Sequence, residues 1–411
     1  MNIHQSHSEA PDHLERRAFL GRAAAALPVL YAAGRPVNSK AEEEEPAATD
    51  EKPMADPAYP GVISRQRQPR NAEFPFPTLN SFLTPNEQFY IRTHFEVPRL
   101  QATDWKLKVE GHVERPVEIS YDELRKAGSQ ELTALLECSG NSRVLLEPPQ
   151  VSIRWEQAGV SNARWTGVPL SAVLKRAGVK PGAVEVILEG HDAGEFKPPQ
   201  SSTPGKIHYA RSLPLEQAHR PEVLLAWQMN GSDLPPEHGY PVRAVVAGWY
   251  GMASVKWLRR IIVTDRPFHG YFQTFAYSIW ERQPDGLPTL VPVTRMHVKS
   301  QIARPMLHEA VERKARYRVH GAAWAGEAEV SRVEISTNGG KSWEAARLDE
   351  RSEPFTWRFF EYQWQVPSQP GRYTLMSRAT DSRGNVQPLE RDGDRRNAVV
   401  NHVQPMEVLV R

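Results

Sequence analysis

The cysteine content constrains this chain most, because only one of its 411 residues, Cys138, is a cysteine. A single cysteine cannot form an intramolecular disulfide, a four-cysteine zinc site, an iron–sulfur cluster or the CxxCH attachment site of a haem. The chain is long enough for two or three domains with a sizeable core. Any redox chemistry must therefore use Cys138 itself or a cofactor that Cys138 helps to hold.

The sequence around Cys138 predicts that this residue lies where a buried element opens into a loop. The apolar run 132–136 before it is typical of a short buried strand. Residues 139–141 (Ser-Gly-Asn) then favour a turn, and Arg143 follows closely. A thiolate beside a guanidinium can act as a nucleophile or as a soft metal ligand. The alternative is that Cys138 is simply a small buried hydrophobic residue, as many free cysteines are.

The charge composition argues against some function classes. The chain has 51 Lys and Arg residues against 49 Asp and Glu residues, which gives a formal net charge of +2. A general nucleic-acid-binding protein would show a basic excess. Charged residues make up 24% and hydrophobic residues 40% of the chain, as in ordinary soluble globular proteins. No apolar run reaches the roughly 18 residues of a membrane span, so we expect no transmembrane helix in the mature protein.

The N-terminal residues carry a targeting pattern. Residues 15–21 contain the twin arginines Arg16 and Arg17, and a short apolar region, 23–33, follows them. We therefore predict a twin-arginine signal peptide over residues 1–33 and export to the periplasm. A charged turn followed by a short helix is the alternative. Residues 34–60 are rich in Pro, Ala and Glu, which predicts a disordered linker.

The next region, 61–290, mixes strand and helix signals. Apolar and β-branched patterns predict strands, and a capping box at Ser120 and a stop at Gly178 predict two helices. The stretch 155–170, with its glycines and tryptophans, instead favours a structured loop. The predicted strands are 89–95, 105–111, 184–190 and 244–247, and the third of them is expected to end at residues 191–192. One predicted helix starts at residue 120, and the other covers residues 170–177.

Three segments of this region carry basic side chains that are suited to an anion. Arg92 and His94 fall on one face of the predicted strand 89–95 by the two-residue period. The segments 238–243 and 251–258 combine glycine-containing loops with basic side chains, which is what a phosphate needs. Neither is a P-loop or a Rossmann turn, so a nucleotide is not indicated. Taken singly, each basic residue could also be an ordinary surface charge.

A second domain is predicted to begin near Val291. Residues 330–336, the turn 338–340 and residues 342–348 give the strongest hairpin signal in the chain. Further short strands with turns between them, over about a hundred residues, predict an immunoglobulin-like sandwich without the paired cysteines of antibody domains. No catalytic cluster is visible in it, and such a domain usually supplies packing or dimerisation surface.

Five segments, in this order along the chain, resemble those of the sulfite oxidase family of molybdopterin enzymes. The resemblance covers roughly residues 60–411 and implies an α+β fold. A molybdopterin-binding catalytic domain of residues 61–290 would precede an immunoglobulin-like dimerisation domain of residues 291–411. The segments are 89–94 (Phe-Tyr-Ile-Arg-Thr-His), 137–143 (Glu-Cys-Ser-Gly-Asn-Ser-Arg), 162–167 (Asn-Ala-Arg-Trp-Thr-Gly), 238–243 (His-Gly-Tyr-Pro-Val-Arg) and 254–260 (Ser-Val-Lys-Trp-Leu-Arg-Arg).

The resemblance also implies roles for individual residues. Cys138 would be the thiolate ligand of molybdenum, which is held by one pterin. An anion pocket would be formed by Arg92, Arg143, Trp155 and Tyr277. Thr93 stands where many family members carry Asn, which affects the pterin contact but not the fold. The groups expected to hold the pterin and its phosphate are Tyr90, Arg92, Thr93, His94, Asp192, His238, Arg243, Ser254, Val255 and Lys256.

The implied activity is molybdenum-dependent oxidation of sulfite to sulfate by oxygen-atom transfer. The chain has no haem-attachment motif, so we expect no haem in it and expect electrons to pass to an external acceptor such as a soluble c-type cytochrome. The expected substrate is sulfite or a similar small sulfur oxyanion. The expected assembly is a homodimer built through the second domain.

Three alternatives stay open at this point. A related molybdoenzyme could reduce nitrate or a sulfoxide, or could oxidise another sulfur compound. Nitrate-reducing relatives usually carry fused haem and flavin domains, and sulfoxide-reducing relatives usually lack the terminal sandwich. A cofactor-free binding or scaffold protein could also have kept the fold, although Cys138, Arg92 and Arg143 argue against it.

Overall fold

The computed structural model describes residues 54–56, 59–149, 152–197 and 202–411, which belong to one compact unit of residues 48–411. The predicted signal peptide, residues 1–33, lies outside the described residues. Strand structure begins before the predicted end of the linker at residue 60. It starts with Met54–Asp56 (β1) and Tyr59–Gln66 (β2), so the described end of that segment is part of the fold.

The first sheet has the order β1-β2-β3-β4, with Asn71–Glu73 as β3 and Ile91–Arg92 as β4. The strand predicted over 89–95 is therefore wrong except for β4, which pairs antiparallel with β3. The remaining backbone of residues 89–95 does not pair with another strand. Its side chains instead turn towards a cavity, which is described below.

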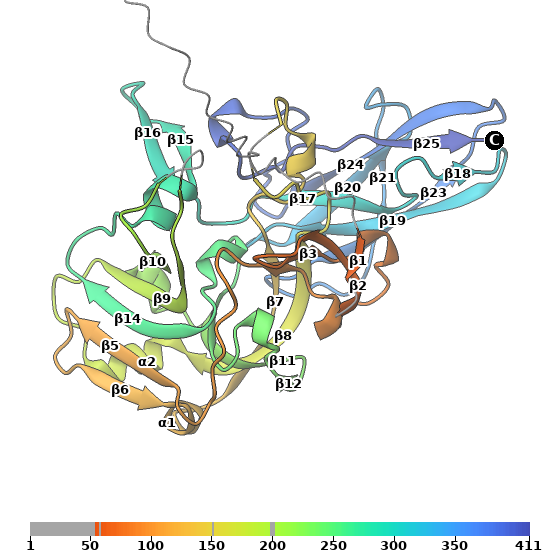
Figure 1. The fold of residues 1–411 in the computed structure, drawn as a ribbon. Helices are drawn as coiled ribbons and strands as arrows, with labels where there is room; N and C mark the ends of the chain where they lie inside the picture. Colours follow the sequence, from red (N-terminus) through yellow and green to blue (C-terminus); the bar gives the residue numbers. More distant parts are fainter. Residues whose placement is uncertain (1–53, 57–58, 150–151, 198–201) are drawn as a thin grey trace, which may run out of the picture. The chain divides into compact units, whose positions relative to one another are not determined.

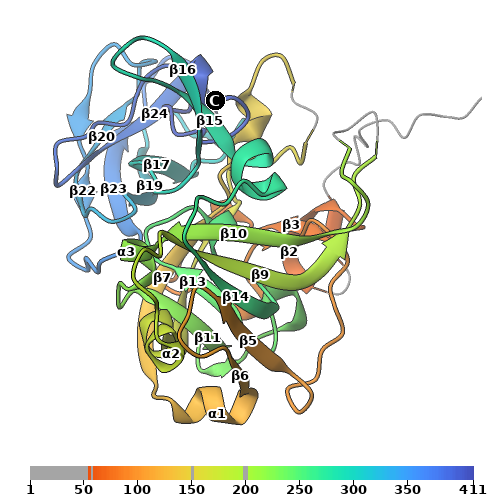
Figure 2. The same ribbon diagram turned by 90° about the vertical axis from the view of Figure 1, so that its left-hand side faces the viewer.

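A second sheet has five strands in the order β10-β9-β14-β5-β6, which lie side by side in Figure 2. Its β14 and β5 are parallel and the other pairs are antiparallel. The prediction for 184–190 was too short, because β9 continues through residues 191–192 to Gly194. The strands are Lys106–Gly111 (β5), Val117–Ser120 (β6), Glu185–Gly194 (β9), Ile207–Pro214 (β10) and Leu258–Thr264 (β14).

A third sheet carries the cysteine at one strand end. Its order is β12-β11-β8-β7, and β13 also pairs with β11. The loop predicted over 155–170 is wrong for most of its length, because β8 pairs with β7 over the whole of β7. The strands are Gln130–Glu137 (β7), Val160–Pro169 (β8), Val223–Met229 (β11), Ser232–Asp233 (β12) and Arg243–Val246 (β13).

Helices are few and short, and the two predicted ones are confirmed. Tyr121–Lys126 (α1) begins with the capping box of Ser120 and Glu123. Leu170–Ala177 (α2) buries one apolar face and ends at Gly178, whose φ of +70° suits glycine. The other helical elements are Leu215–Ala218 (α3), the 3₁₀ turns Phe76–Thr78 (η1), Asn86–Gln88 (η2), Arg143–Leu145 (η3), Pro236–His238 (η4), Gly251–Ala253 (η5) and Gly393–Arg395 (η7), and a π-helix at Tyr271–Ala276 (η6).

The second domain is a sandwich of two sheets, seen beside the C-terminus in Figure 1. One sheet has the order β17-β19-β23-β22 and the other β18-β25-β24-β20-β21. The strands are Lys299–Arg304 (β17), Ala310–Val311 (β18), Arg316–Trp324 (β19), Val330–Ser336 (β20), Glu344–Ala345 (β21), Arg347–Leu348 (β22), Arg358–Gln365 (β23), Gly371–Asp381 (β24) and Met406–Val410 (β25).

The predicted hairpin is confirmed only in its first half. β20 pairs with β21 around the turn 338–340, but β22 leaves this pair and joins β23 in the opposite sheet. The chain therefore crosses between the two layers within a few residues. A separate two-stranded hairpin, Ser278–Arg282 (β15) and Pro288–Pro292 (β16), precedes the sandwich.

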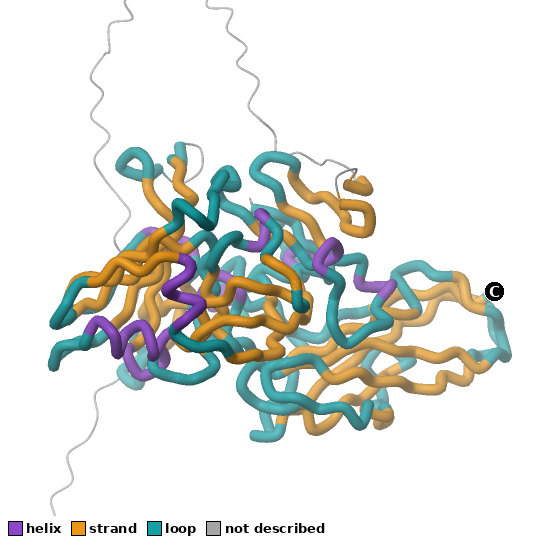
Figure 3. The backbone as a smooth tube through the Cα atoms, turned by 90° about the horizontal axis from the view of Figure 1, so that it is seen from below, coloured by secondary structure: helices purple, strands orange, loops and turns teal. Residues whose placement is uncertain are grey.

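The two domains share a hydrophobic core. The largest buried cluster contains Trp324 and Trp357 of the second domain together with first-domain residues such as Leu135. Strands dominate the chain and helices are sparse, as Figure 3 shows, which confirms the predicted α+β class with a terminal sandwich. Among the described residues, none of the helices has the length and apolar composition needed to cross a bilayer.

Candidate active site

A cavity lies in the first domain and is lined by aromatic and charged side chains and by Cys138. It brings together segments that are far apart in the sequence, from residue 89 to residue 277. Most of the predicted site residues line it. These are Tyr90, Arg92, Thr93, His94, Cys138, Asp192, His238, Arg243, Ser254, Lys256 and Tyr277.

Three predicted residues do not line this cavity, namely Arg143, Trp155 and Val255. Arg143 is buried behind the cysteine turn. It donates from Nε to the carbonyl of Asn397 (2.9 Å) and from Nη1 to the carbonyl of Ile153 (2.9 Å). The roles predicted for these three residues stay predictions, and Arg143 already has protein acceptors.

Cys138 is held at the end of β7 by its own backbone. Its N–H donates to the carbonyl of Gly159 (2.8 Å), and its carbonyl accepts from the N–H of Asn141 (2.8 Å). The side-chain Oδ1 of Asn141 accepts from the N–H of Gly159 (3.2 Å), which closes a small ring of bonds around the turn. The cysteine is 6% exposed and faces the cavity, so its thiol is available to a bound group but not to bulk water.

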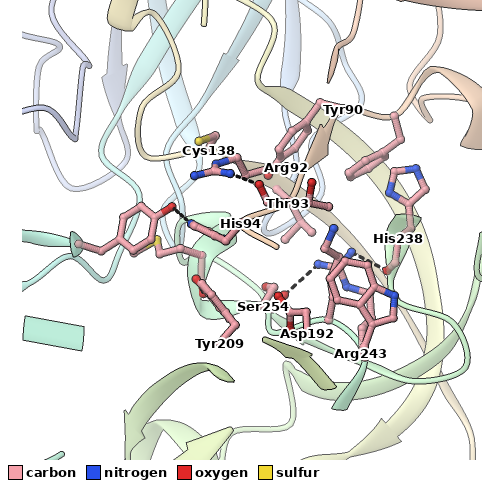
Figure 4. A pocket seen from close by; sticks show the side chains of 17 residues that line it. Tyr90, Arg92, Thr93, His94, Cys138, Asp192, Tyr209, His238, Arg243 and Ser254 are labelled. Carbon is pink, nitrogen blue, oxygen red and sulfur yellow. Dashed lines mark hydrogen bonds between the residues drawn. The ribbon is translucent and has the colours of Figure 1, made fainter. Parts of the chain in front are cut away.

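Arg92 lies next to Cys138 at one end of the cavity (Figure 4). Its Nη1 donates to Oδ1 of Asn71 (3.2 Å) and to the carbonyl of Thr93. Asn71 also accepts from the N–H of Thr93 (3.0 Å), so one buried amide fixes both residues. The guanidinium is thus oriented before any ligand binds.

A histidine–tyrosine pair adjoins this end. Nε2 of His94 lies 2.6 Å from Oη of Tyr277. The imidazole also stacks on the ring of Tyr209, with 4.7 Å between the two ring centroids. Burial, followed by the charges of Arg92 and Lys256, holds the pKa of His94 well below its usual value. The imidazole is therefore neutral at neutral pH, and its tautomer decides whether Nε2 donates to or accepts from the tyrosine hydroxyl.

The other end of the cavity is basic (Figure 4). Arg243 donates from Nη1 to the carbonyl of His238 (3.0 Å) and from Nη2 to the carbonyl of Ser254 (3.0 Å). Burial lowers the pKa of Arg243 to about 10. Burial and the charge of Arg243 also hold the pKa of Lys256 well below its usual value. Burial raises the pKa of Asp192 to about 7, so this carboxyl compensates the cations only in part.

This end fits an anionic group such as a phosphate. His238 is 2% exposed, and its Nε2 has no hydrogen-bond partner among the described residues. A buried polar atom without a partner is costly unless a ligand or water satisfies it. A bound phosphate would both accept hydrogen bonds and offset the uncompensated charges of Arg243 and Lys256. With a soft thiolate donor at the other end, the cavity suits a phosphorylated cofactor that carries a soft-ligated metal.

Comparison with known protein families agrees with this donor set. Residues 94–272 match the family described as "Oxidoreductase molybdopterin binding domain", and residues 291–400 match "Mo-co oxidoreductase dimerisation domain". Sulfite oxidase of Gallus gallus is 35% identical over 372 residues, which cover 86% of this chain and 79% of that protein. The chain belongs to the sulfite oxidase family. It is therefore a molybdopterin-type oxidoreductase, as the five segments predicted.

Other sulfite oxidase family relatives differ in length. Human mitochondrial sulfite oxidase is 35% identical over 369 residues, 84% of this chain but only 64% of the human protein. Nitrate reductase [NADH] 1 of Arabidopsis thaliana is 30% identical over 358 residues, and this chain spans 38% of it. Among solved structures, the sulfane dehydrogenase SoxCD of Paracoccus pantotrophus matches with a TM-score of 0.70 and 30% identity, covering 82% of this chain and 84% of that chain.

Sequence reasoning missed several residues that line the cavity. Phe89 and Trp257 lie within recognised segments and could have been included on that ground. Tyr209 had no local signal, because its contacts, the ring of His94 and a hydrogen bond to the carbonyl of Met252 (2.7 Å), come from distant segments. The cavity-lining residues that were not predicted are Phe89, Leu136, Tyr209, Gly251, Met252 and Trp257.

Proposed function

We propose that this protein oxidises sulfite, or a similar small sulfur oxyanion, and passes the electrons to an external acceptor such as a soluble c-type cytochrome. The observation that carries the proposal is the pairing of Cys138 with Arg92 at one end of a buried, basic cavity. A thiolate is a suitable ligand for a redox metal, and an oriented guanidinium is suited to an oxyanion. The family relationship supports the same chemistry.

Cys138 would hold molybdenum, and the basic end would hold the phosphate of a single molybdopterin through Arg243, His238 and Lys256. When bound, this group supplies two-electron oxidation with oxygen-atom transfer. Most of the lining side chains are buried, and a low local dielectric strengthens the charge interactions among them. We propose no haem in this chain.

The substrate end relies on preorganised donors. Arg92 would bind anionic oxygens of the substrate with a guanidinium that Asn71 already orients, so little reorganisation is needed. The Tyr277 hydroxyl would donate to the substrate or to water in the tautomer in which Nε2–H of His94 donates to Oη and holds it in position. Arg143 and Trp155 lie behind the cavity lining and would support the turn that carries the cysteine.

The function is tested by metal analysis combined with a sulfite assay. Purified protein is expected to contain about one molybdenum per chain and to reduce ferricyanide or cytochrome c only when sulfite is added. Absence of molybdenum, or reduction that is independent of sulfite, would refute the proposal. A nitrate-dependent oxidation of a reduced dye in the same preparation would point to the reverse chemistry instead.

A second candidate substrate is a sulfane sulfur. The observation that favours it is the similarity to SoxCD, whose printed name is sulfane dehydrogenase and whose chain is covered to 84%. The same assay, with sulfite and a sulfane compound compared at equal concentration, separates the two. The substrate with the higher kcat/KM is the preferred one.

Export to the periplasm is proposed from the twin arginines alone. Replacing Arg16 and Arg17 together by Lys is expected to leave the protein in the cytoplasm, since the translocation machinery reads the arginine pair itself. Cell fractionation followed by immunoblotting measures this, with Arg22→Lys as a control outside the pair. Unchanged periplasmic protein in the double variant would contradict the targeting proposal.

A homodimer built through residues 291–411 is proposed from the match of this region to a dimerisation domain. Sedimentation velocity at micromolar concentration is expected to give twice the mass of one chain. A monomer at that concentration would argue against the assembly. The result is independent of the metal content, so it can be obtained on any folded preparation.

A further inference from the structure

A buried carboxylate beside Cys138 connects the cysteine turn to the second domain. Glu137, the residue before the cysteine, is 2% exposed. Its Oε1 accepts from Nζ of Lys299 on β17 (3.1 Å), and its Oε2 accepts from Nε1 of Trp324 on β19 (2.9 Å). Both oxygens of this catalytic-domain carboxylate are thus bonded to strands of the sandwich.

The ammonium of Lys299 touches both sides of the cysteine turn. Besides Glu137 it donates to Oγ of Ser142 (3.0 Å) and to the carbonyl of Asn141 (3.4 Å). Ser142 has a φ of +74°, a left-handed conformation that a serine adopts only when its surroundings hold it. One fully buried cation therefore ties the residue before Cys138 to the residues that follow the turn.

Other second-domain groups hold the same turn. On β17, Oε1 of Gln301 accepts from Nδ2 of Asn141 (3.1 Å). The N–H of Val399 donates to the carbonyl of Ser139 (2.6 Å). The turn is thus fixed from the second domain at its start, its middle and its end.

A buried ion pair is a weak means of adding stability, because desolvation of both charges offsets most of their attraction. Its directional hydrogen bonds do, however, specify geometry. The Glu137–Lys299 pair lies against the one residue whose position the proposed chemistry demands. Neither Glu137 nor Lys299 lines the cavity, so any effect on the site acts through residues that do, such as Leu136 and Cys138 on either side of Glu137.

We propose that Lys299 is a positioning residue, which, with Glu137 and Trp324, fixes the Cys138 thiol in the cavity before any cofactor binds. The sandwich then completes the catalytic site within each chain and is more than a surface for dimerisation. The effect on catalysis rests on the proposed function, whereas the positioning itself does not.

The single cysteine makes this testable without the cofactor. Full-length protein is produced in a host that cannot make molybdopterin, and the rate at which a thiol reagent labels Cys138 is measured under native conditions. Cys138 is 6% exposed and faces the cavity, so a reagent that enters the cavity reaches its thiol only slowly unless the turn opens locally. Lys299→Met removes the ammonium at nearly constant volume, and we expect labelling at least about tenfold faster than in wild type, because the local opening becomes more populated.

Ser300→Ala is the matched control. Ser300 is the next residue on β17 and is also buried, but its Oγ bonds within the sandwich, to Ser377 (2.9 Å) and Gln387 (2.8 Å). This variant weakens the same strand without touching the cysteine turn, and its labelling rate is expected to stay within about twofold of wild type. If Lys299→Met labels no faster than Ser300→Ala, the positioning role is wrong.

A double variant separates the positioning of Cys138 from the stability of the fold. It also replaces Lys299→Met in the experiment if that single variant does not fold. Glu137→Gln with Lys299→Met leaves no buried unpaired charge, so its thermal midpoint is expected to recover towards wild type. Labelling is expected to stay fast, since the ammonium that joins residue 137 to residue 142 is gone. Of the side-chain bonds to residue 137, only that from Nδ2 of Asn141 (3.1 Å) still joins the two sides of the turn. Recovery of slow labelling together with stability would overturn the proposal. If wild type made in a competent host lacks molybdenum and sulfite activity, the proposed function fails while the labelling result stands.

Discussion

Cys138→Ser is expected to lower the sulfite oxidation rate by orders of magnitude while the protein stays folded. The substitution exchanges a soft thiolate donor for a hard hydroxyl at an almost unchanged volume. Cys138 faces the cavity and its backbone, not its side chain, makes the bonds that hold the turn. The expected loss of folding stability is therefore small, about 1 kcal/mol or less.

Three measurements on one preparation check this prediction. Steady-state sulfite oxidation gives the activity, elemental analysis gives the molybdenum content, and thermal unfolding gives the stability. Ser139→Ala is the control, a similarly small change of side chain at the next position. The buried hydroxyl of Ser139 has no hydrogen-bond partner among the described residues, and Ser139 does not line the cavity. A Cys138→Ser protein with near wild-type activity would rule out the ligand assignment.

How far the sequence predicted the fold depended on whether a signal was local. The capping box at Ser120 and the stop at Gly178 are contained in a few residues, and both helices are confirmed. The strand β8 was missed because Gly167 and its neighbours favoured a loop. The structure gives Gly167 another purpose, since a Cβ there would lie 2.3 Å from the carbonyl oxygen of Leu225 on β11. The glycine permits close approach of two strands, which no local pattern reveals.

The segment 89–95 was predicted as a strand for its aromatic and β-branched content. Only β4 pairs, because the side chains that follow are committed to the cavity. Arg92 and His94 were expected to share a strand face, and both do reach the cavity, Arg92 from the end of β4 and His94 from the irregular backbone after it. The two residues were therefore placed together correctly although the element that carries them was not, and their binding of an anion stays a prediction.

The candidate site was predicted best where motif and cavity coincide. Basic residues in recognised segments, such as Arg243 and Lys256, line the cavity. Tyr209 was missed because its place depends on contacts across the sheet. The hydrogen bonds from Lys299 to the cysteine turn could not be predicted from the sequence either, because Lys299 and Glu137 lie 162 residues apart. A sequence shows which residues can do chemistry, but the residues that place them come from tertiary packing.

Arg92→Gln is expected to lower kcat/KM for sulfite by roughly one to two orders of magnitude. The change removes a positive charge and a bidentate donor but leaves Cys138 and the basic end in place. A charge-assisted hydrogen bond contributes about 1.5–3 kcal/mol, and each 1.36 kcal/mol is about tenfold in rate. Most of the effect is expected in KM if the lost interaction is in ground-state binding. Arg92→Lys should recover only part, because an ammonium lacks the planar fork.

Salt dependence distinguishes a substrate contact from a structural effect of Arg92. Raising the ionic strength is expected to weaken sulfite binding more in wild type than in Arg92→Gln, because screening acts on the charge that was removed. Arg164→Gln, whose half-exposed side chain lies outside the cavity, removes the same net charge and should leave KM unchanged. Kinetics at two salt concentrations, with molybdenum content measured for each protein, decide the question. A fully loaded Arg92→Gln enzyme with an unchanged KM for sulfite would show that the anion pocket lies elsewhere.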